Sequence, residues 1–466
     1  MNLPITPPLW PFASLLRRFA IYLKMGCVVL LILCLLIPLG MIRSILSERL
    51  GRRNAAIEEM TTTWGREQNV VGPVLIVPYR YASKSWKEKP TADGKIEKME
   101  VIETAVARAY FLPANLAITG DIQPTQLRRG IYQAVVYAGT LELAGQFARP
   151  SFAAWKVEEH DILWDDAVVA FAIPDLRGVK GALQLHWGES RLPLMPGSKL
   201  RGFTSGVFTR VGPWPDSETL PFKLSLTLNG SGGIHFAPVG EQNSAKISSP
   251  WPDPSFCGAF LPAERQVTPA GFTANWKLTY YGRDYAQQWI DAEESASLNA
   301  TSAANSLFGV RFLAGVDAYR HVERAIKYGI LFLVLVFTAF FLFEIVSALR
   351  IHPFQYALVG AALCLFYLGL LSLSEFIAFS KSYVLAATMT TLLIWFYCVS
   401  VLRSGRRTLL VVGLLAAIYS FLFVALQLQD YALLFGTGGL FLALTAVFLV
   451  TRNIDWYTRD QTPTTA

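Results

Sequence analysis

Six apolar stretches constrain this chain more than any other feature, because each is long enough to cross a lipid bilayer. A membrane-spanning helix needs roughly 20 mostly apolar residues. One stretch lies near the start of the sequence and five follow one another after residue 327, at about 25–42, 328–349, 354–373, 382–402, 408–428 and 431–451. The sequence therefore predicts a multi-pass α-helical membrane protein with six transmembrane helices, one followed by a bundle of five.

The segment 44–327, between the first and second spans, has a different pattern and is predicted to form a large β-rich, sandwich-like domain. Apolar residues alternate with polar ones in 220–228 and 271–280, as they do in half-buried antiparallel strands. The Gly-rich segment 229–233 predicts a turn, and the Ser/Ala/Asn/Thr-rich segment 295–306 predicts a loop. Residues 44–63 are expected to continue the first helix.

These patterns divide the chain into four parts. A tail and the first transmembrane helix occupy 1–43, the β-rich domain 44–327, the five-helix bundle 328–457, and a second tail 458–466. The first apolar run exceeds the roughly 7–15 residues of a signal peptide's apolar region, so we interpret it as an uncleaved anchor.

The basic residues are distributed unevenly, and this predicts the orientation. Segment 44–327 holds 30 Lys and Arg against 29 Asp and Glu, whereas the rest of the chain holds 11 against 5. With the N-terminus in the cytoplasm, nine basic residues of the short flanks lie inside and Lys381 alone lies outside, as the positive-inside rule requires. Both termini are then cytoplasmic and the β-rich domain is periplasmic. The nearly neutral domain does not favour nucleic-acid binding.

The sequence contains no recognisable catalytic motif, and we expect no enzymatic activity, no metal and no cofactor. It lacks the G-x-S-x-G, H-E-x-x-H, Walker and C-x-x-C patterns. The acidic segment 158–166 is expected to be a solvated loop. Cys257 is the only cysteine of the predicted domain, so the domain has no internal disulfide.

Two carboxylates of the bundle are candidate functional residues within the membrane. Glu344 interrupts an otherwise apolar span, and ionisable residues there face a partner, a cavity or a pathway. Pairing with Arg350, or extension of the carboxylate to the interface, would give Glu344 a structural role; ligand or proton handling is the alternative. Glu375 is expected at the opposite interface, near Lys381.

Two proline-containing segments predict local structure. His352 and Pro353 are expected to cap the start of the third span, because proline suits the first helical turn. In the β-rich domain, Trp251, Pro252, Asp253 and Phe256 form either a partner-binding surface or a tight structural turn, and the turn is favoured.

Six segments also resemble the CreD family of bacterial inner-membrane proteins, and they cover nearly the whole chain in order. In the bundle they are RAIKYGILFLVLVFTAFFLFEIVSALRIHPFQYALVGAALCLFYLGLLSLSE (324–375), DYALLFGTGGLF (430–441) and TRNIDWY (451–457); in the domain they are VGPVLIVPY (71–79), RRGIYQAVVY (128–137) and WPDPSFCGAFLPAERQV (251–267). One departure is visible: Phe376 stands where the family commonly has a histidine after the glutamate, so proton or metal handling by such a pair is in doubt here.

The resemblance implies a protein of the Gram-negative inner membrane that takes part in cell-envelope integrity, envelope stress and colicin tolerance under a two-component system. We therefore expect the periplasmic domain to interact with an envelope protein or a peptidoglycan-associated partner, while the bundle contacts the lipid bilayer; homo-oligomerisation remains open. The alternative is a transporter or flippase-like protein that uses the five-helix bundle. Against transport, the bundle lacks paired charges and matching broken helices.

Overall fold

The computed structural model describes most of the chain, in the ranges 20–90, 96–293, 297–313, 318–346, 351–402, 404–428 and 431–452. The chain divides into two compact units. A helical unit combines the residues up to 54 with those from 316 onward, and a β-rich unit comprises 55–315.

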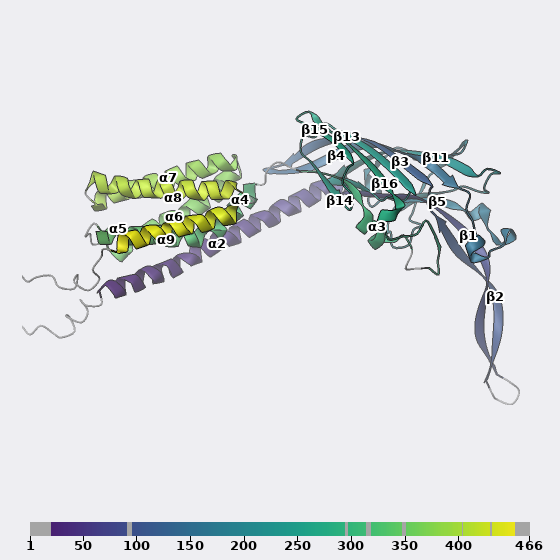
Figure 1. Ribbon diagram of the computed structural model, residues 1–466, viewed down its shortest axis with the longest axis horizontal. Coiled ribbons are helices and arrows are strands. Elements are labelled where there is room, and N and C mark those ends of the chain that lie inside the picture. The colour runs from purple at the N-terminus through teal and green to yellow at the C-terminus, as the bar shows by residue number, and fades with distance from the viewer. Residues whose placement is uncertain are drawn as a thin grey trace, which may run out of the picture. The chain divides into compact units, whose positions relative to one another are not determined.

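Seven described helices contribute to the helical unit, drawn in purple and in green to yellow in Figure 1: α2 (Ala20–Trp64), α4 (Ala318–Lys327), α5 (Gly329–Val346), α6 (Pro353–Ser374), α7 (Phe379–Leu402), α8 (Gly405–Gln427) and α9 (Ala432–Thr451). Five of them are long and apolar enough to cross a membrane, and α4 with α5 forms a further candidate span, bent by 48°. The predicted fold class, one span followed by five with a β-rich domain between them, is confirmed.

Helix α6 forms the centre of the helical unit's core. Its Phe366 ring lies 5.3 Å from Tyr383 of α7 and 4.8 Å from Tyr419 of α8, measured between ring centroids. Tyr419 also packs against Phe332 of α5, at 5.0 Å. In contrast, α9 has no buried residue among those described, although its Phe435 ring stacks on that of Phe421 in α8, with the centroids 4.9 Å apart.

The start of α6 is capped as predicted. His352 lies just outside the helix and its Nδ1 accepts a hydrogen bond from the backbone N–H of Phe354, while Gln355 Oε1 accepts one from the His352 N–H. Pro353 occupies the first helical turn, where its missing N–H has no intrahelical partner.

The boundary of the β-rich domain differs from the prediction of 44–327. Helix α4 belongs to the helical unit, because Val322, Ala325 and Ile326 lie on one of its faces and are buried in that unit's core. The polar face of α4 carries charged residues like those of the preceding domain, so the sequence analysis assigned this amphipathic helix to that domain. At the other boundary, α2 continues to Trp64, as expected for 44–63.

The β-rich unit is built from two nine-stranded sheets. The first has the order β14-β18-β12-β1-β5-β10-β9, with β2 and β17 attached through β1, and the second has the order β15-β16-β13-β3-β4-β11-β7-β8, with β6 beside β11. The strands are β1 (Gln68–Pro90), β2 (Ile96–Phe111), β3 (Asn115–Arg129), β4 (Tyr132–Ala148), β5 (Val168–Ala172), β6 (Val179–Lys180), β7 (Gln184–Trp187), β8 (Ser190–Pro193), β9 (Met195–Pro196), β10 (Gly206–Arg210), β11 (Thr219–Ser231), β12 (Gly233–Phe236), β13 (Gln242–Ser249), β14 (Pro254–Gly258), β15 (Glu264–Thr268), β16 (Gly271–Thr279), β17 (Gln288–Ile290) and β18 (Phe308–Phe312).

The sheets are mixed, whereas the sequence predicted antiparallel pairing. Strands β1 and β12 are parallel, as are β3 and β13. Parallel neighbours need a long crossover connection, and more than 100 residues separate the members of each pair along the chain. Local turn signals describe only the hairpins, so they could not reveal these pairings.

One hydrophobic core lies between the sheets. Trp276 of β16 and Phe308 of β18 come from different sheets, and their ring centroids lie 5.7 Å apart. Along β11, burial alternates with exposure from residue 220 to residue 228, which confirms the predicted strand there.

The segment 229–233 is mostly strand, whereas the sequence predicted a turn. Strand β11 continues to Ser231, and only Gly232, with φ of +71°, separates it from β12. A Cβ at Gly230 would lie 2.3 Å from the Tyr137 hydroxyl oxygen. The glycine therefore allows the strand to pass close to a buried tyrosine.

The loop predicted over 295–306 contains a short helix, α3 (Ala300–Ser306). Asn299 caps it: its Oδ1 accepts hydrogen bonds from the backbone N–H groups of Thr301 and Ser302, and Ser302 Oγ accepts one from the Asn299 N–H. Such a capping box satisfies N–H groups that have no intrahelical partner. The polar composition of the segment concealed this local signal.

We predict that Asn299→Ala weakens α3 by about 1 kcal/mol, the usual contribution of an N-cap side chain. Hydrogen exchange of the α3 amides in the full-length protein should accelerate roughly fivefold in this variant, whereas Asn299→Asp, which keeps the acceptor, should exchange as the wild type does. Equal exchange in Asn299→Ala and the wild type would contradict the capping role.

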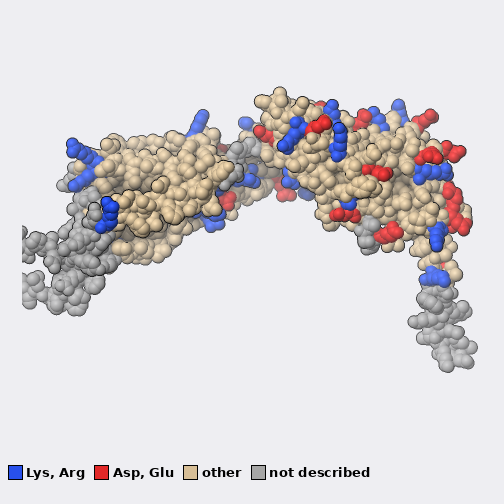
Figure 2. Space-filling model, viewed as in Figure 1, with Lys and Arg blue, Asp and Glu red and all other residues tan. Residues whose placement is uncertain are grey.

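The charged side chains have different distributions on the two units. Figure 2 shows lysines and arginines near an end of the helical unit, whose visible face is otherwise largely uncharged, and acidic and basic side chains intermixed over the β-rich unit. An uncharged helical surface suits contact with lipid.

Candidate functional site

Three helices of the bundle converge on the carboxylate of Glu344, which is 7% exposed. Its Oε1 forms an ion pair with Lys24 Nζ of α2 and accepts a hydrogen bond from the backbone N–H of Ile351 at 3.1 Å. Its Oε2 accepts a hydrogen bond from the Tyr356 hydroxyl of α6 at 2.8 Å. Both carboxylate oxygens are thus satisfied within the protein.

Lys24 is the partner that the sequence analysis missed. Its ammonium also donates to the carbonyl oxygen of Ile351 at 2.7 Å and lies 5.9 Å from the centre of the Tyr356 ring. Arg350, the partner proposed from sequence, lies outside the described residues. In the sequence, Lys24 is one of the basic residues that flank the first span; 320 positions separate it from Glu344, and no local pattern relates the two.

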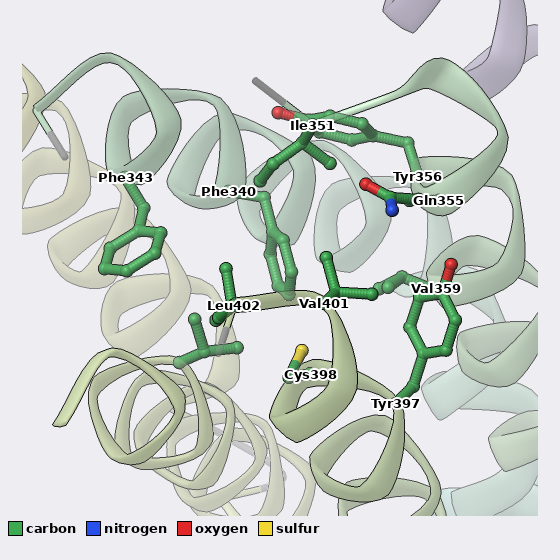
Figure 3. Close-up of a pocket in the computed structure, with 11 residues that line it drawn as sticks. Phe340, Phe343, Ile351, Gln355, Tyr356, Val359, Tyr397, Cys398, Val401 and Leu402 are labelled. Carbon is green, nitrogen blue, oxygen red and sulfur yellow. The ribbon is translucent and has the colours of Figure 1, made fainter. Parts of the chain in front are cut away.

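A small cavity of about 20 Å³ lies beside this cluster. Figure 3 shows the rings of Phe340 and Phe343 and the Cys398 sulfur around it, with the polar ends of Gln355 and Tyr397 also among its lining side chains. That volume accommodates about one water molecule. It is too small for a transported substrate.

A larger hollow of about 580 Å³ lies between α5, α8 and α9. It contains no charged side chain, and its lining consists of aliphatic, aromatic and small residues with Thr338. Such a surface suits hydrocarbon and offers no ligands for an ion.

Glu375, the second predicted carboxylate, makes a similar junction at the C-terminal end of α6. Its side chain is 8% exposed; Arg49 Nε of α2 lies 3.6 Å from Oε1, and the Tyr319 hydroxyl of α4 donates to the same oxygen at 3.2 Å. The expected neighbour Lys381 is exposed. Glu375 therefore joins α2, α4 and α6.

The two junctions hold α2 on either side of its apolar part: Lys24 lies just before it, and Arg49 lies seven residues after its end at 42. Lys24 and Arg49 are about 38 Å apart along the helix, at about 1.5 Å per residue. The hydrocarbon core of a bilayer is about 30 Å thick, and about 40–45 Å with its headgroup regions. For a helix that crosses the bilayer along its normal, this separation would put the two ion pairs near opposite interfaces, where charged groups are less costly than at the bilayer centre.

We predict that Lys24→Met destabilises the helical unit by about 3 kcal/mol, because it leaves the Glu344 carboxylate buried without a counter-charge. The double variant Lys24→Met/Glu344→Gln should regain part of this loss. Reversible unfolding of the full-length protein in mixed detergent micelles measures both values.

The matched control is Glu48→Gln, on the same helix. Glu48 pairs with Arg52 at 2.6 Å, but both side chains are largely exposed, and exposed ion pairs contribute little to stability. If Lys24→Met unfolded at the same detergent composition as Glu48→Gln, the prediction that the buried pair stabilises the helical unit would be wrong.

The four residues proposed as an interaction surface in the β-rich unit are only partly exposed. Trp251 and Phe256 are half-buried: the Trp251 ring packs edge-on against Phe312, and the Phe256 ring lies 5.5 Å from that of Phe272. Pro252 and Asp253 are exposed. The aromatic residues thus anchor a turn, and the turn leads directly into β14.

Strand β14 is an edge strand and lies next to this turn. Among the described strands it pairs only with β18, and β15, the next strand along the chain, pairs only with β16 at the edge of the other sheet. All five residues of β15 are exposed, and they include Glu264 and Arg265. Strand β14 has no charged residue.

Comparison with known proteins supports the interpretation of this architecture. The family model described as inner membrane protein CreD matches residues 20–457. The chain is also 29% identical over 428 residues to inner membrane protein CreD of Escherichia coli (strain K12), and this match covers 91% of each chain. The chain belongs to the CreD family of inner membrane proteins.

Proposed function

We propose that the protein contributes to cell-envelope integrity by binding another envelope component through the open edge of β14. One observation carries this proposal. Among the described strands, β14 has no partner on its outer side, and β14 itself has no charged residue. Native edge strands are usually protected by charges, proline, bulges, short length or a covering element. β14 is five residues long and begins with Pro254, but it carries no charge. An edge without charges is suited to accept an added strand.

The partner that fits such an edge is an extended segment of an envelope protein. Added strands bind through backbone hydrogen bonds, and side-chain pockets supply the specificity. The exposed turn residues Pro252 and Asp253 would lie beside the bound segment. β15, which carries charges of both signs, is the less favourable edge.

The proposed function requires the topology expected from the sequence, in which both termini lie in the cytoplasm and the β-rich unit lies in the periplasm. It also includes a role in an envelope response under two-component control and in colicin tolerance, as the resemblance to the family implies. The geometry offers less support for transport, because Glu344 is fully paired and its neighbouring cavity holds about one water molecule. Binding at a sheet edge also requires no catalytic activity.

Photocrosslinking in intact cells tests the edge directly. A photoreactive residue placed at Ser255 of β14 should give discrete crosslinks to an envelope protein, because an added strand would lie about 4.8 Å away. The control is the same probe at Arg191 of β8, which lies at the far edge of the other sheet. We expect no discrete product from Arg191.

A charged residue introduced into β14 should weaken binding of the partner and so reduce crosslinking. Ser255→Lys should reduce the crosslinking from a second probe at Pro252, since lysine on an edge strand opposes strand addition, while Arg191→Glu should leave it unchanged. Equal yields from Ser255 and Arg191, or a yield from Pro252 that Ser255→Lys does not change, would contradict the proposal.

A further inference from the structure

Four residues that are distant in sequence form a row across four neighbouring strands of the first sheet. Cys257 of β14 is opposite Gly309 of β18, Gly309 is opposite His235 of β12, and His235 is opposite Asn69 of β1. Residues opposite one another in a sheet share a face. The row therefore brings a thiol, an imidazole and an amide to one face of the sheet.

The polar atoms of the row are within hydrogen-bonding distance. Cys257 Sγ lies 3.2 Å from His235 Nε2, and His235 Nδ1 lies 3.1 Å from Asn69 Oδ1. The amide oxygen can only accept, so Nδ1 carries the proton and the lone pair of Nε2 faces the thiol. A base oriented by a third group beside a nucleophile is the arrangement that activates cysteine in covalent catalysis.

Gly309 makes the contact between thiol and imidazole possible. A Cβ at this position would lie 2.1 Å from the carbonyl oxygen of Ile234 and 3.0 Å from Cδ2 of the His235 ring. Without a side chain on the strand between them, Cys257 and His235 meet across β18.

Two charged neighbours on the same face act in opposite directions on the His235 imidazole: Glu67 favours its protonated form and Arg311 disfavours it. Glu67 Oε1 lies 3.4 Å from His235 Nδ1, and Arg311 Nε donates to the same Glu67 oxygen at 3.1 Å. Burial lowers the pKa of His235, although Glu67 opposes this effect, and burial raises the pKa of the Cys257 thiol. The resting pair is therefore a neutral thiol and a neutral imidazole that is able to accept a proton.

The row is accessible from one side and borders a cavity on the other. Cys257 is half-buried, whereas His235 is 5% exposed. A cavity of about 220 Å³ is lined by Asn69, by Leu307 just before β18, by residues 202–205 and by α3. This cavity adjoins the Asn69 end of the row, and the thiol and the imidazole lie outside its lining.

We propose that Cys257 is a nucleophilic thiol that accepts an acyl group from an ester or thioester, with His235 as its general base and Asn69 as the residue that orients the imidazole. The sulfur attacks the carbonyl carbon, and a C–S bond forms as the C–O or C–S bond to the leaving group breaks. The thiol proton passes to His235 Nε2 and then to the leaving alcohol or thiol. The product is a thioester on Cys257, and the step needs no oxidant or reductant. This chemistry is independent of strand addition at the β14 edge.

Acylation of the full-length protein in detergent by p-nitrophenyl acetate tests the proposal, with peptide mass spectrometry reporting the acetyl group on Cys257 separately from the four other cysteines. His235→Gln should slow acetylation of Cys257 at pH 7 by roughly 100-fold, the usual contribution of a general base. Asn69→Ala should slow it less. His186→Gln, which changes a half-buried histidine elsewhere in the β-rich unit, should leave the rate unchanged.

The pH profile of the wild type gives a second readout that needs no variant. The rate should fall on acidification, because His235 becomes protonated and cannot accept the thiol proton, and the fall should occur at lower pH than for a free imidazole, because burial lowers the pKa of His235. Burial has the largest effect on this midpoint, and Glu67 and Arg311, the charged groups that face the imidazole, raise and lower it respectively. Acetylation that rises steadily through pH 9, or an equal rate in His235→Gln and the wild type, would overturn the proposal.

Discussion

The buried ion pair between Lys24 and Glu344 is the interaction on which the arrangement of the helical unit depends. Helix α2 is separated from the other helices by more than 250 residues of chain, so no short connection holds it against them. Lipid tails are as apolar as the helix surfaces, and association in a membrane therefore relies on packing and polar contacts. Glu344 and Glu375 supply such contacts on either side of the apolar part of α2.

The β-rich unit combines a well-packed interior with an open boundary. Its two sheets share one aromatic core, yet β14 and β15 follow each other along the chain and leave an edge of each sheet open. Strand β14 carries both the uncharged edge and Cys257. The edge proposed for binding and the thiol paired with an imidazole thus lie on one short strand, held in place by the packing of Phe256.

Local patterns in the sequence predicted much of the fold and little of the candidate sites. Apolar length gave the six spans, and the alternation in 220–228 gave a strand of the sandwich. His352 and Pro353 gave the cap of α6. The same reasoning missed the cap of α3, because its segment has the polar composition of a loop, and assigned α4 to the β-rich domain, because its polar face resembles that domain in composition. It singled out Glu344 as an ionisable residue within a span, but it did not identify the partner Lys24.

The sequence by itself therefore determines the features that depend on residues close together in the chain: the length of apolar segments, the alternation of apolar and polar residues, and helix capping. Tertiary structure alone decided the partners of the charged and polar groups. Lys24 meets Glu344 only after three helices pack, and Cys257 meets His235 only because the registers of β14, β18 and β12 align around a glycine. These contacts join positions tens to hundreds of residues apart, and their energies depend on burial, which no local pattern of residues specifies.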